Sequence, residues 1–209
     1  MKKIAITGAN LQERTVLTNA VSYLTGYDVV RQTAYQIQAI KYRLNTEIKN
    51  SNWQELLVYV LSSFSERIEI EQQFERFVSN GSVFNELASM KAIYSYNSKH
   101  KRENKKYVLM LSGLEKIIAE YALKEYDCII HIDRNTDEDD AVLQIANQNL
   151  LSLIQNCKIK YYITKESGLS DMLEKIVTDM NTRTIISPET AVAKAQKDVL
   201  DVQVCALMN

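Results

Sequence analysis

Short apolar runs alternate with longer stretches of helical periodicity along the chain, and this alternation is the strongest constraint on its fold. The first run, 3–7, ends directly at Gly8, as a buried parallel strand does. Strands are expected at 3–7, 27–30, 76–79, 127–132 and 159–163, with a last short one at 184–186. Helices are expected from Thr15 to Gly26 and at 33–44, 53–74, 83–96, 107–124, 137–155, 169–180 and 188–199. Because helices that connect parallel strands cover both faces of a sheet, the pattern predicts a three-layer α/β domain with a mainly parallel central sheet.

Length and composition favour a single domain over residues 1–209. Of the 209 residues, 46% are hydrophobic, which is enough for one sizeable core. The formal net charge is −1, so no overall field attracts nucleic acid or an anionic membrane. Three cysteines without C-x-x-C spacing and two histidines argue against a zinc site. No apolar run approaches the roughly 18 residues of a membrane span, so we expect a cytoplasmic protein with reduced thiols. The sequence leaves the oligomeric state open.

The segment GANLQERT, residues 8–15, lies where the first expected strand meets the first expected helix. A phosphate-binding loop (Walker A motif) reads G-x-x-x-x-G-K-[ST], and it holds an anion with backbone N–H groups at a helix start. Gly8 and Thr15 fit this pattern, whereas Glu13 and Arg14 stand at the glycine and lysine positions. Ligands of parallel α/β sheets bind at the carboxyl ends of the strands, which is where this segment falls. The candidate nucleotide contacts in this degenerate loop are Gly8, Ala9, Asn10, Leu11, Gln12, Glu13, Arg14 and Thr15.

Four segments, taken in order along the chain, resemble the small P-loop kinases, especially the ribosylnicotinamide-kinase-like, AAA-type ATPase/kinase branch. The resemblance covers roughly residues 2–165. Its segments are KKIAITGANLQERTVLTNAV (2–21), YDVVRQTAY (27–35), FVSNGSVFNELA (77–88) and YDCIIHIDRNTDEDDAVLQIANQNLLSLI (126–154). The resemblance implies a P-loop fold, ATP or another nucleotide as ligand, a lid-like segment at about 133–155 and a nucleotide contact from Arg134.

The chain departs from the resemblance where the family carries charge. Gln32 stands for a glutamate after the second strand, and Tyr35 for its partner arginine. Asn80-Gly81 replaces an Asp-Arg pair after the third strand, and Asn85 replaces the aspartate that follows. The resemblance makes Gln32, Tyr35, Asn80 and Asn85 candidates for the substrate pocket. An amide keeps the reach of a carboxylate, but it cannot act as a general base and is a poor ligand for Mg²⁺.

Two loop residues each have two interpretations. Glu13 would place a negative charge beside a bound triphosphate, and like charges about 4 Å apart repel by ~1–4 kcal/mol. Alternatively, it is a first-turn acid that complements the helix dipole. Arg14 can grip phosphate through its guanidinium group, or it is a solvated helix arginine.

Two charged runs have simple explanations beside more specific ones. The acids of 133–140 can form a divalent-metal site, but Thr136 as a helix cap followed by first-turn acids explains them more simply. The basic run 99–106 can contact RNA or another anion, but a solvated loop is the interpretation we favour.

Three functional hypotheses follow. The first is a P-loop kinase-like pseudoenzyme that binds a nucleotide or phosphate but is catalytically impaired, with weak dependence on Mg²⁺. The second is an active ATP-dependent small-molecule (nucleoside-type) kinase or ATPase in which Arg14 replaces the loop lysine. The third is a structural or partner-binding module with no ligand in the loop. A small-molecule nucleotide or phosphate is the expected partner, whereas nucleic acid and membrane are not.

Overall fold

A parallel sheet of five strands forms the centre of the molecule. The computed structural model describes residues 2–8, 11–31, 53–96, 105–133, 141–164 and 168–207. Within these residues the strand order is β2-β3-β1-β4-β5, and every pairing is parallel. The strands are β1 Lys3–Thr7, β2 Asp28–Val30, β3 Phe77–Asn80, β4 Cys128–Ile132 and β5 Tyr161–Thr164. The predicted α/β fold with β1 in a central position is therefore confirmed.

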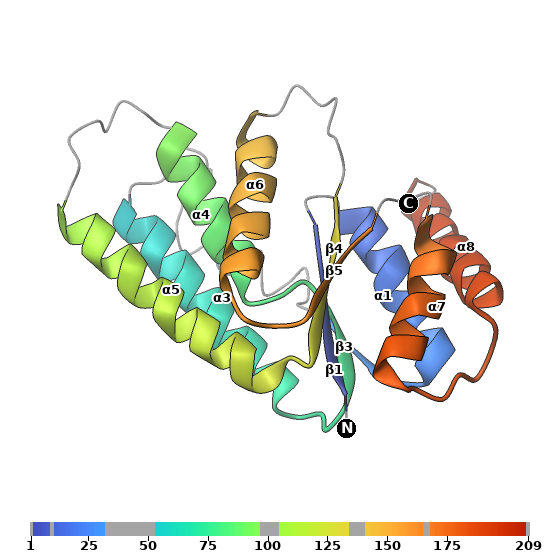
Figure 1. The fold of residues 1–209 in the computed structure, drawn as a ribbon. Helices are drawn as coiled ribbons and strands as arrows, with labels where there is room; N and C mark the ends of the chain where they lie inside the picture. Colours follow the sequence, from blue (N-terminus) through green and yellow to red (C-terminus); the bar gives the residue numbers. More distant parts are fainter. Residues whose placement is uncertain are drawn as a thin grey trace.

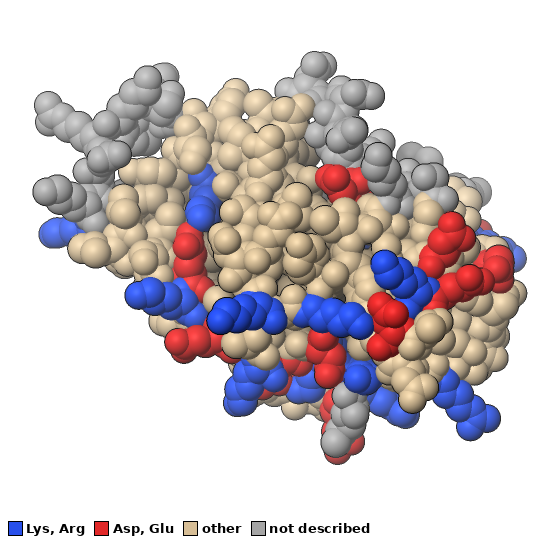
Figure 2. Space-filling view, in the orientation of Figure 1, with Lys and Arg blue, Asp and Glu red and all other residues tan. Residues whose placement is uncertain are grey.

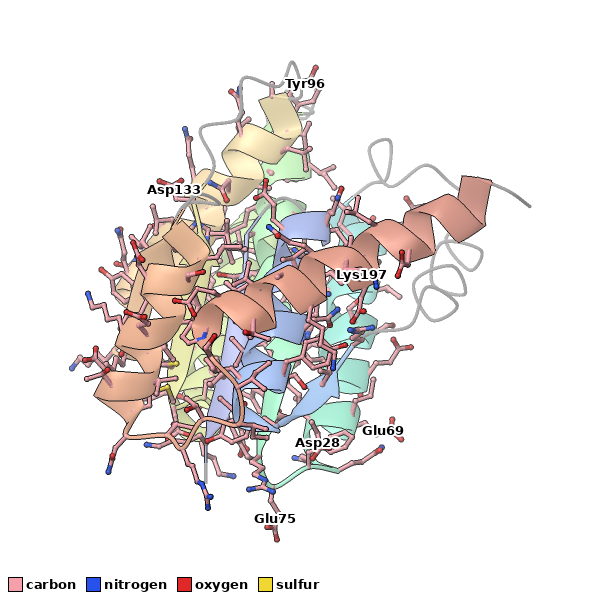
Figure 3. The ribbon with its side chains drawn as sticks, turned by 90° about the vertical axis from the view of Figure 1, so that its right-hand side faces the viewer. Asp28, Glu69, Glu75, Tyr96, Asp133 and Lys197 are labelled. Atoms are coloured by element: carbon pink, nitrogen blue, oxygen red, sulfur yellow. The ribbon has the colours of Figure 1, made fainter. Side chains whose placement is uncertain are left out.

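The strand registers define two edges of the sheet. Ile6 pairs with Asn80, and Thr7 pairs with His131, so the carboxyl ends of β1, β3 and β4 meet. We call this end the carboxyl edge, and the opposite end, where the strands begin, the amino edge. Figure 3 shows Asp133, which follows β4, toward one end of the molecule and Glu75, which precedes β3, at the other.

Helices cover both faces of the sheet (Figure 1). One layer contains α1 Leu11–Thr25, α7 Leu169–Met180 and α8 Pro188–Leu207. The other contains α3 Trp53–Glu71, α4 Phe84–Tyr96, α5 Lys105–Glu125 and α6 Ala141–Asn156. The described part of the expected lid-like segment is mainly α6, which lies beside α4. Asn149 on α6 donates a hydrogen bond to the Ala88 carbonyl on α4 at 3.5 Å.

The sheet has a separate apolar core on each face. Ile4 and Ile6 pack with α1, α7 and α8, whereas Ala5 between them belongs to the cluster under the other four helices. All five residues of β4 are buried. Because both faces of β1 and β4 are buried, these two strands are nearly continuous apolar runs in the sequence.

The surface is mixed in charge on the face shown in Figure 2. Lysine and arginine side chains lie beside aspartate and glutamate along its lower part, while the region over α6 is formed mostly by other residues. Among the described helices, none is long and apolar enough to cross a membrane.

Three expected element positions differ from the structure. The segment 184–186 is not a strand, because the Ile185 amide donates to the Leu24 carbonyl at the end of α1, at 2.8 Å, instead of pairing with a sheet edge. Helix α1 begins at Leu11 rather than Thr15, and α8 continues to Leu207. The helix expected at 33–44 lies outside the described residues.

Gly26 ends α1 as the sequence predicts, and it gives a test of the fold. Its φ is +72°, its amide donates to the Ser22 carbonyl at 2.7 Å, and an added Cβ would lie 2.7 Å from Ile185 Cδ1. Gly26→Ala is therefore expected to lower the free energy of unfolding by about 1–2 kcal/mol, measured by urea denaturation. The matched control is Gly113→Ala in the exposed middle of α5, where an added Cβ meets nothing within 4 Å. This control is expected to stabilise by roughly 0.5–1 kcal/mol, and equal losses in both variants would contradict the assignment.

Candidate functional site

The loop segment 8–15 lies at the carboxyl edge: Gly8 follows β1, and residues 11–15 are already the start of α1. Gly8 follows β1 with a φ of +147°, and a Cβ on it would lie 3.0 Å from the Ile132 carbonyl oxygen at the end of β4. A side chain at this position would therefore collide with the neighbouring strand. Gly8 lets the chain turn out of the sheet beside β4 without that collision, which explains a glycine at this position.

Arg14 extends across the start of the loop. Its Nη1 donates to the Gly8 carbonyl at 2.7 Å. Its Nε is buried and has no hydrogen-bond partner in the described part of the chain. Burial lowers the pKa of Arg14 to about 10, and the positive charge of Arg67 acts in the same direction. Arg14 is still a cation at neutral pH, and a largely desolvated cation with an unused N–H donor is suited to holding an anion.

Thr15 and Asn80 meet at the carboxyl edge, although 65 residues separate them in the chain. Asn80 ends β3, and its Nδ2 donates to Thr15 Oγ1 at 2.9 Å. The Thr15 hydroxyl in turn donates to the Leu11 carbonyl at 2.8 Å. Asn80 Oδ1 is buried without a partner among the described residues. The resemblance implies an aspartate at position 80. In this chain an amide N–H, rather than a carboxylate, contacts the Thr15 hydroxyl.

Asn85 occupies a different place from Asn80. Its Oδ1 accepts hydrogen bonds from the Ser82 amide at 2.8 Å and the Ser82 hydroxyl at 3.2 Å. The Ser82 hydroxyl also accepts from the Phe84 amide at 3.2 Å. These reciprocal contacts form a capping arrangement at the start of α4, in which the side chain of Asn85 is already engaged.

Leu11, Gln12 and Thr15 line a cavity of about 550 Å³ on the outer side of the loop helix. The other walls come from α1, from Arg31 just after β2, and from α8; the remaining lining residues are Asn19, Tyr23, Arg31, Asp198 and Val199. Arg31 donates to Asn19 Oδ1, and the Tyr23 hydroxyl donates to Asp198 Oδ2. The hydrogen bond to Asp198 raises the pKa of Tyr23. A cleft thus adjoins Leu11, Gln12 and Thr15, whereas Gly8, Arg14 and Asn80 do not line it.

The contribution of α8 to this cavity was missed by sequence reasoning, because the resemblance ends before that helix. One local signal was available. Thr15, Asn19 and Tyr23 recur every four residues and so form a polar stripe along α1. Such a stripe beside an apolar helix face indicates a surface that faces a cleft or another polar element.

Glu13 is buried in the first turn of α1, with 7% of its surface exposed. This position agrees with a first-turn acid near the positive end of the helix dipole. Five further candidates, Ala9, Asn10, Gln32, Tyr35 and Arg134, lie outside the described residues. Among the residues that are described, no group of three or more His, Cys, Asp or Glu is placed to hold a metal ion.

A buried ionic network lies behind Asn80, and sequence reasoning did not find it. Arg67 and Glu71 on α3 are 2% and 1% exposed, and Arg67 Nη1 lies 3.8 Å from Glu71 Oε1. Arg67 Nη2 lies 3.4 Å from Oε1 of Glu86 on α4. Ser79 of β3 joins the pair, because it accepts from Arg67 Nη1 at 3.0 Å and donates to Glu71 Oε1 at 2.9 Å. The signal in the sequence is the i,i+4 spacing of Arg67 and Glu71, which continues the helix face of Leu56 and Val60.

Two tyrosines complete this network. Tyr121 on α5 donates to Glu71 Oε2 at 3.0 Å, and Tyr126 donates to Glu71 Oε1 at the same distance. Burial raises the pKa of Glu71, while Arg67 and these hydrogen bonds act against that rise. Burial alone would lower the pKa of Arg67, but Glu86 and Glu71 raise it above its ordinary value. The network fixes β3 and the segment after it against three helices.

The parallel sheet and its two helical layers form an α/β fold that is shared with solved nucleoside kinase structures. The deoxyadenosine kinase from M. mycoides has this fold. Its structure with the products dCMP and a flexible dCDP matches with a TM-score of 0.62 and 14% identity, over 86% of this chain and 98% of that chain. Its structure with bound dATP matches with a TM-score of 0.63 and 12% identity, over 87% and 100%.

A third solved structure is more distant. The YorR protein from Bacillus subtilis, in complex with phosphorylated GDP, has a TM-score of 0.47 and 11% identity over 86% of this chain and 96% of that chain. No family model matches the chain, and no curated protein matches it. The two kinase structures therefore establish the fold, and the activity has to be argued from the site.

Proposed function

We propose that the chain binds a nucleotide or another small phosphate compound at residues 8–15 and that its phosphoryl transfer is impaired. The observation that carries this proposal is the arrangement of three residues at the carboxyl edge. Arg14 reaches the Gly8 carbonyl, and Thr15 accepts a hydrogen bond from Asn80. The cation Arg14 and the N-terminus of α1 can both attract an anion. The acid that the resemblance implies at the end of β3 is replaced by the amide of Asn80.

The same arrangement argues against a strong Mg²⁺ site. Mg²⁺ is held in kinase sites by carboxylates, phosphates and water. The Thr15 hydroxyl donates a hydrogen bond to the Leu11 carbonyl, and Asn80 donates an N–H hydrogen bond to the Thr15 oxygen. These two residues thus offer the metal neutral oxygens at most. Nucleotide affinity is therefore expected to depend only weakly on Mg²⁺.

Support for a nucleotide as the ligand comes from the fold and from the cleft. The two deoxyadenosine kinase structures with the same fold hold dATP in one case and dCMP with dCDP in the other. The cavity of about 550 Å³ beside the loop is within the range of small-molecule sites, roughly 300–1,000 Å³. Arg134, Gln32 and Tyr35 remain predicted contacts, and Asn80 and Asn85 remain candidates for the substrate side.

An active kinase or ATPase is the second candidate, and the position of Arg14 is the observation that favours it. Its guanidinium group crosses the loop start and is protonated at neutral pH, so it can supply the positive charge of the usual loop lysine. The two candidates differ in turnover with Mg-ATP and agree on binding.

The test is calorimetric titration with ATP, ADP and GTP, with and without Mg²⁺, beside an assay of phosphate release. We expect binding that changes little with Mg²⁺ and turnover at background. Arg14→Gln is expected to weaken ATP binding by about tenfold or more, because it removes a charge-assisted contact. Arg14→Lys keeps the charge and should lose less.

The matched control is Lys116→Gln, which removes one exposed positive charge on α5. It should leave ATP affinity unchanged. Turnover that depends on Arg14 would favour the active kinase. A well-folded wild-type protein that binds none of the three nucleotides would contradict both candidates and leave the partner-binding module.

A further inference from the structure

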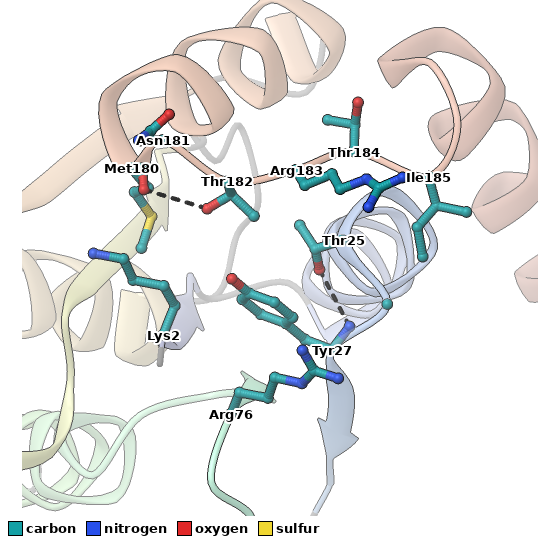
Figure 4. A pocket seen from close by; sticks show the side chains of 11 residues that line it. Lys2, Thr25, Tyr27, Arg76, Met180, Asn181, Thr182, Arg183, Thr184 and Ile185 are labelled. Carbon is teal, nitrogen blue, oxygen red and sulfur yellow. Dashed lines mark hydrogen bonds between the residues drawn. The ribbon is translucent and has the colours of Figure 1, made fainter.

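A second cavity lies at the amino edge, at the opposite end of β1 from the loop. Its volume is about 780 Å³. We call it the amino-edge pocket; its walls come from the residue before β1, the junction of α1 and β2, the residue before β3 and the segment after α7 (Figure 4). Its polar and aromatic lining includes Lys2, Thr25, Tyr27, Arg76, Thr182 and Arg183.

Three cations line this pocket, and none of its eleven lining residues is acidic. Lys2, Arg76 and Arg183 come from three separate segments of the chain. The Arg76 guanidinium lies over the ring of Tyr27, 6.0 Å from its centroid. Within the described part of the protein, none of the three cations has a carboxylate at ion-pair distance. Unpaired positive charge is therefore concentrated in a concave site.

Helix ends give a simpler explanation for these cations, but they account for only part of the charge. α1 and α7 both end at the pocket, and the carboxyl end of each helix carries roughly half a negative charge. Two such ends balance roughly one of the three positive charges. Their carbonyls also have other partners, since Ser22 accepts from the Gly26 amide at 2.7 Å and Val177 accepts from the Thr182 amide at 3.1 Å. The cations are thus left available as donors.

We propose that the amino-edge pocket binds a small phosphorylated compound that carries two or more negative charges. A guanidinium group matches the geometry of phosphate oxygens, and two of the three cations are arginines. The pocket is within the size range of small-molecule sites, roughly 300–1,000 Å³. Tyr27 and Met180 give it an aromatic and an apolar wall for the rest of the ligand. This site is separate from the loop and does not depend on the proposed function.

The probe is inorganic pyrophosphate, followed by amide chemical shifts in NMR, which report where it binds. Saturable shifts are expected at residues 25–27 and 181–185, in the wild type and in Arg14→Gln. Arg76→Gln with Arg183→Gln should weaken these shifts by about tenfold or more, because two charge-assisted contacts are lost. Both arginines are exposed, so the double variant should keep its thermal stability.

The matched control removes two exposed positive charges elsewhere, as Lys116→Gln with Lys197→Gln. It should leave the pyrophosphate affinity at the pocket unchanged. Shifts confined to 8–15, no saturable shift at the amino edge, or equal weakening in both double variants would overturn the proposal. If the proposed function is wrong but this proposal is right, calorimetry will detect no nucleotide binding, while the pyrophosphate shifts at the amino edge will still be seen.

Discussion

Replacing Arg67 by methionine is expected to lower the free energy of unfolding by about 3–5 kcal/mol at neutral pH. The guanidinium group is 2% exposed and lies between the carboxylates of Glu71 and Glu86. Methionine fills much of the same volume but leaves two acids in the interior without their cation. Urea denaturation measures the loss.

The same variant should show a pH dependence of known sign. Burial raises the pKa of Glu71 above its ordinary value of 4.5, and loss of Arg67 raises it further. A carboxyl with a raised pKa in the folded state contributes stability below its ordinary pKa, and this contribution is lost as pH rises through the folded-state value. The deficit of the variant should therefore be largest near neutral pH and shrink as pH falls toward 5.

Two further variants make this result decisive. Adding Glu71→Gln to Arg67→Met should recover part of the loss, because one buried charge is removed with its partner. Lys91→Met is the matched control, since it breaks an ion pair with Glu115 at 2.5 Å whose side chains are 27% and 34% exposed. This partly exposed pair should contribute only about 0–1 kcal/mol. A loss of similar size in the control would mean that burial of the network is not the cause.

Asn80→Asp is expected to make nucleotide binding depend on Mg²⁺. The substitution puts a carboxylate beside Thr15 Oγ1, where the amide now donates a hydrogen bond at 2.9 Å. A carboxylate next to a hydroxyl and a bound phosphate supplies the oxygen ligands that Mg²⁺ requires. Calorimetry with ATP should show that Mg²⁺ increases affinity by about tenfold or more in the variant, and little in the wild type.

Asn85→Asp is the control for this experiment. It also adds one negative charge after β3, but its side chain is engaged with the Ser82 amide and hydroxyl. It should cap α4 as the asparagine does and leave the Mg²⁺ dependence unchanged. A wild-type protein whose ATP affinity already rises by orders of magnitude with Mg²⁺ would contradict the argument from the amides.

Local pattern was enough to predict most of the fold. The apolar run before Gly8 and the helical spacing after it fixed β1 as a buried strand that leads into a helix, and the structure places it centrally. The strand expected at 184–186 was wrong for a physical reason. The backbone amide of an extended residue can bond to any nearby carbonyl, and the Ile185 amide donates to the Leu24 carbonyl at the end of α1. The sequence alone does not identify that partner.

At the candidate site, topology accounts for one contact. Parallel strands bring their carboxyl ends together, and Asn80 at the end of β3 donates a hydrogen bond to Thr15 in α1. The contact of Arg14 with the Gly8 carbonyl and the pairing of Arg67 with two acids were not predictable from the sequence. Both depend on which side chains from distant helices meet in the interior, and periodicity gives only the face of each helix.

The asparagine and glycine at 80–81 have a consequence for any attempt to rebuild the acid–arginine pair of the resembling kinases. Gly81 has a φ of +108°, and a Cβ there would lie 2.9 Å from Arg67 Nη2. Restoring a side chain at 81 therefore collides with Arg67, while removing Arg67 first exposes Glu71 and Glu86 to the penalty described above. Positions 67 and 81 are therefore coupled: removing Arg67 clears space for a side chain at 81, but the positive φ of Gly81 still disfavours one. A change at 67 alone or at 81 alone is thus expected to lower stability, whatever its effect on ligand binding.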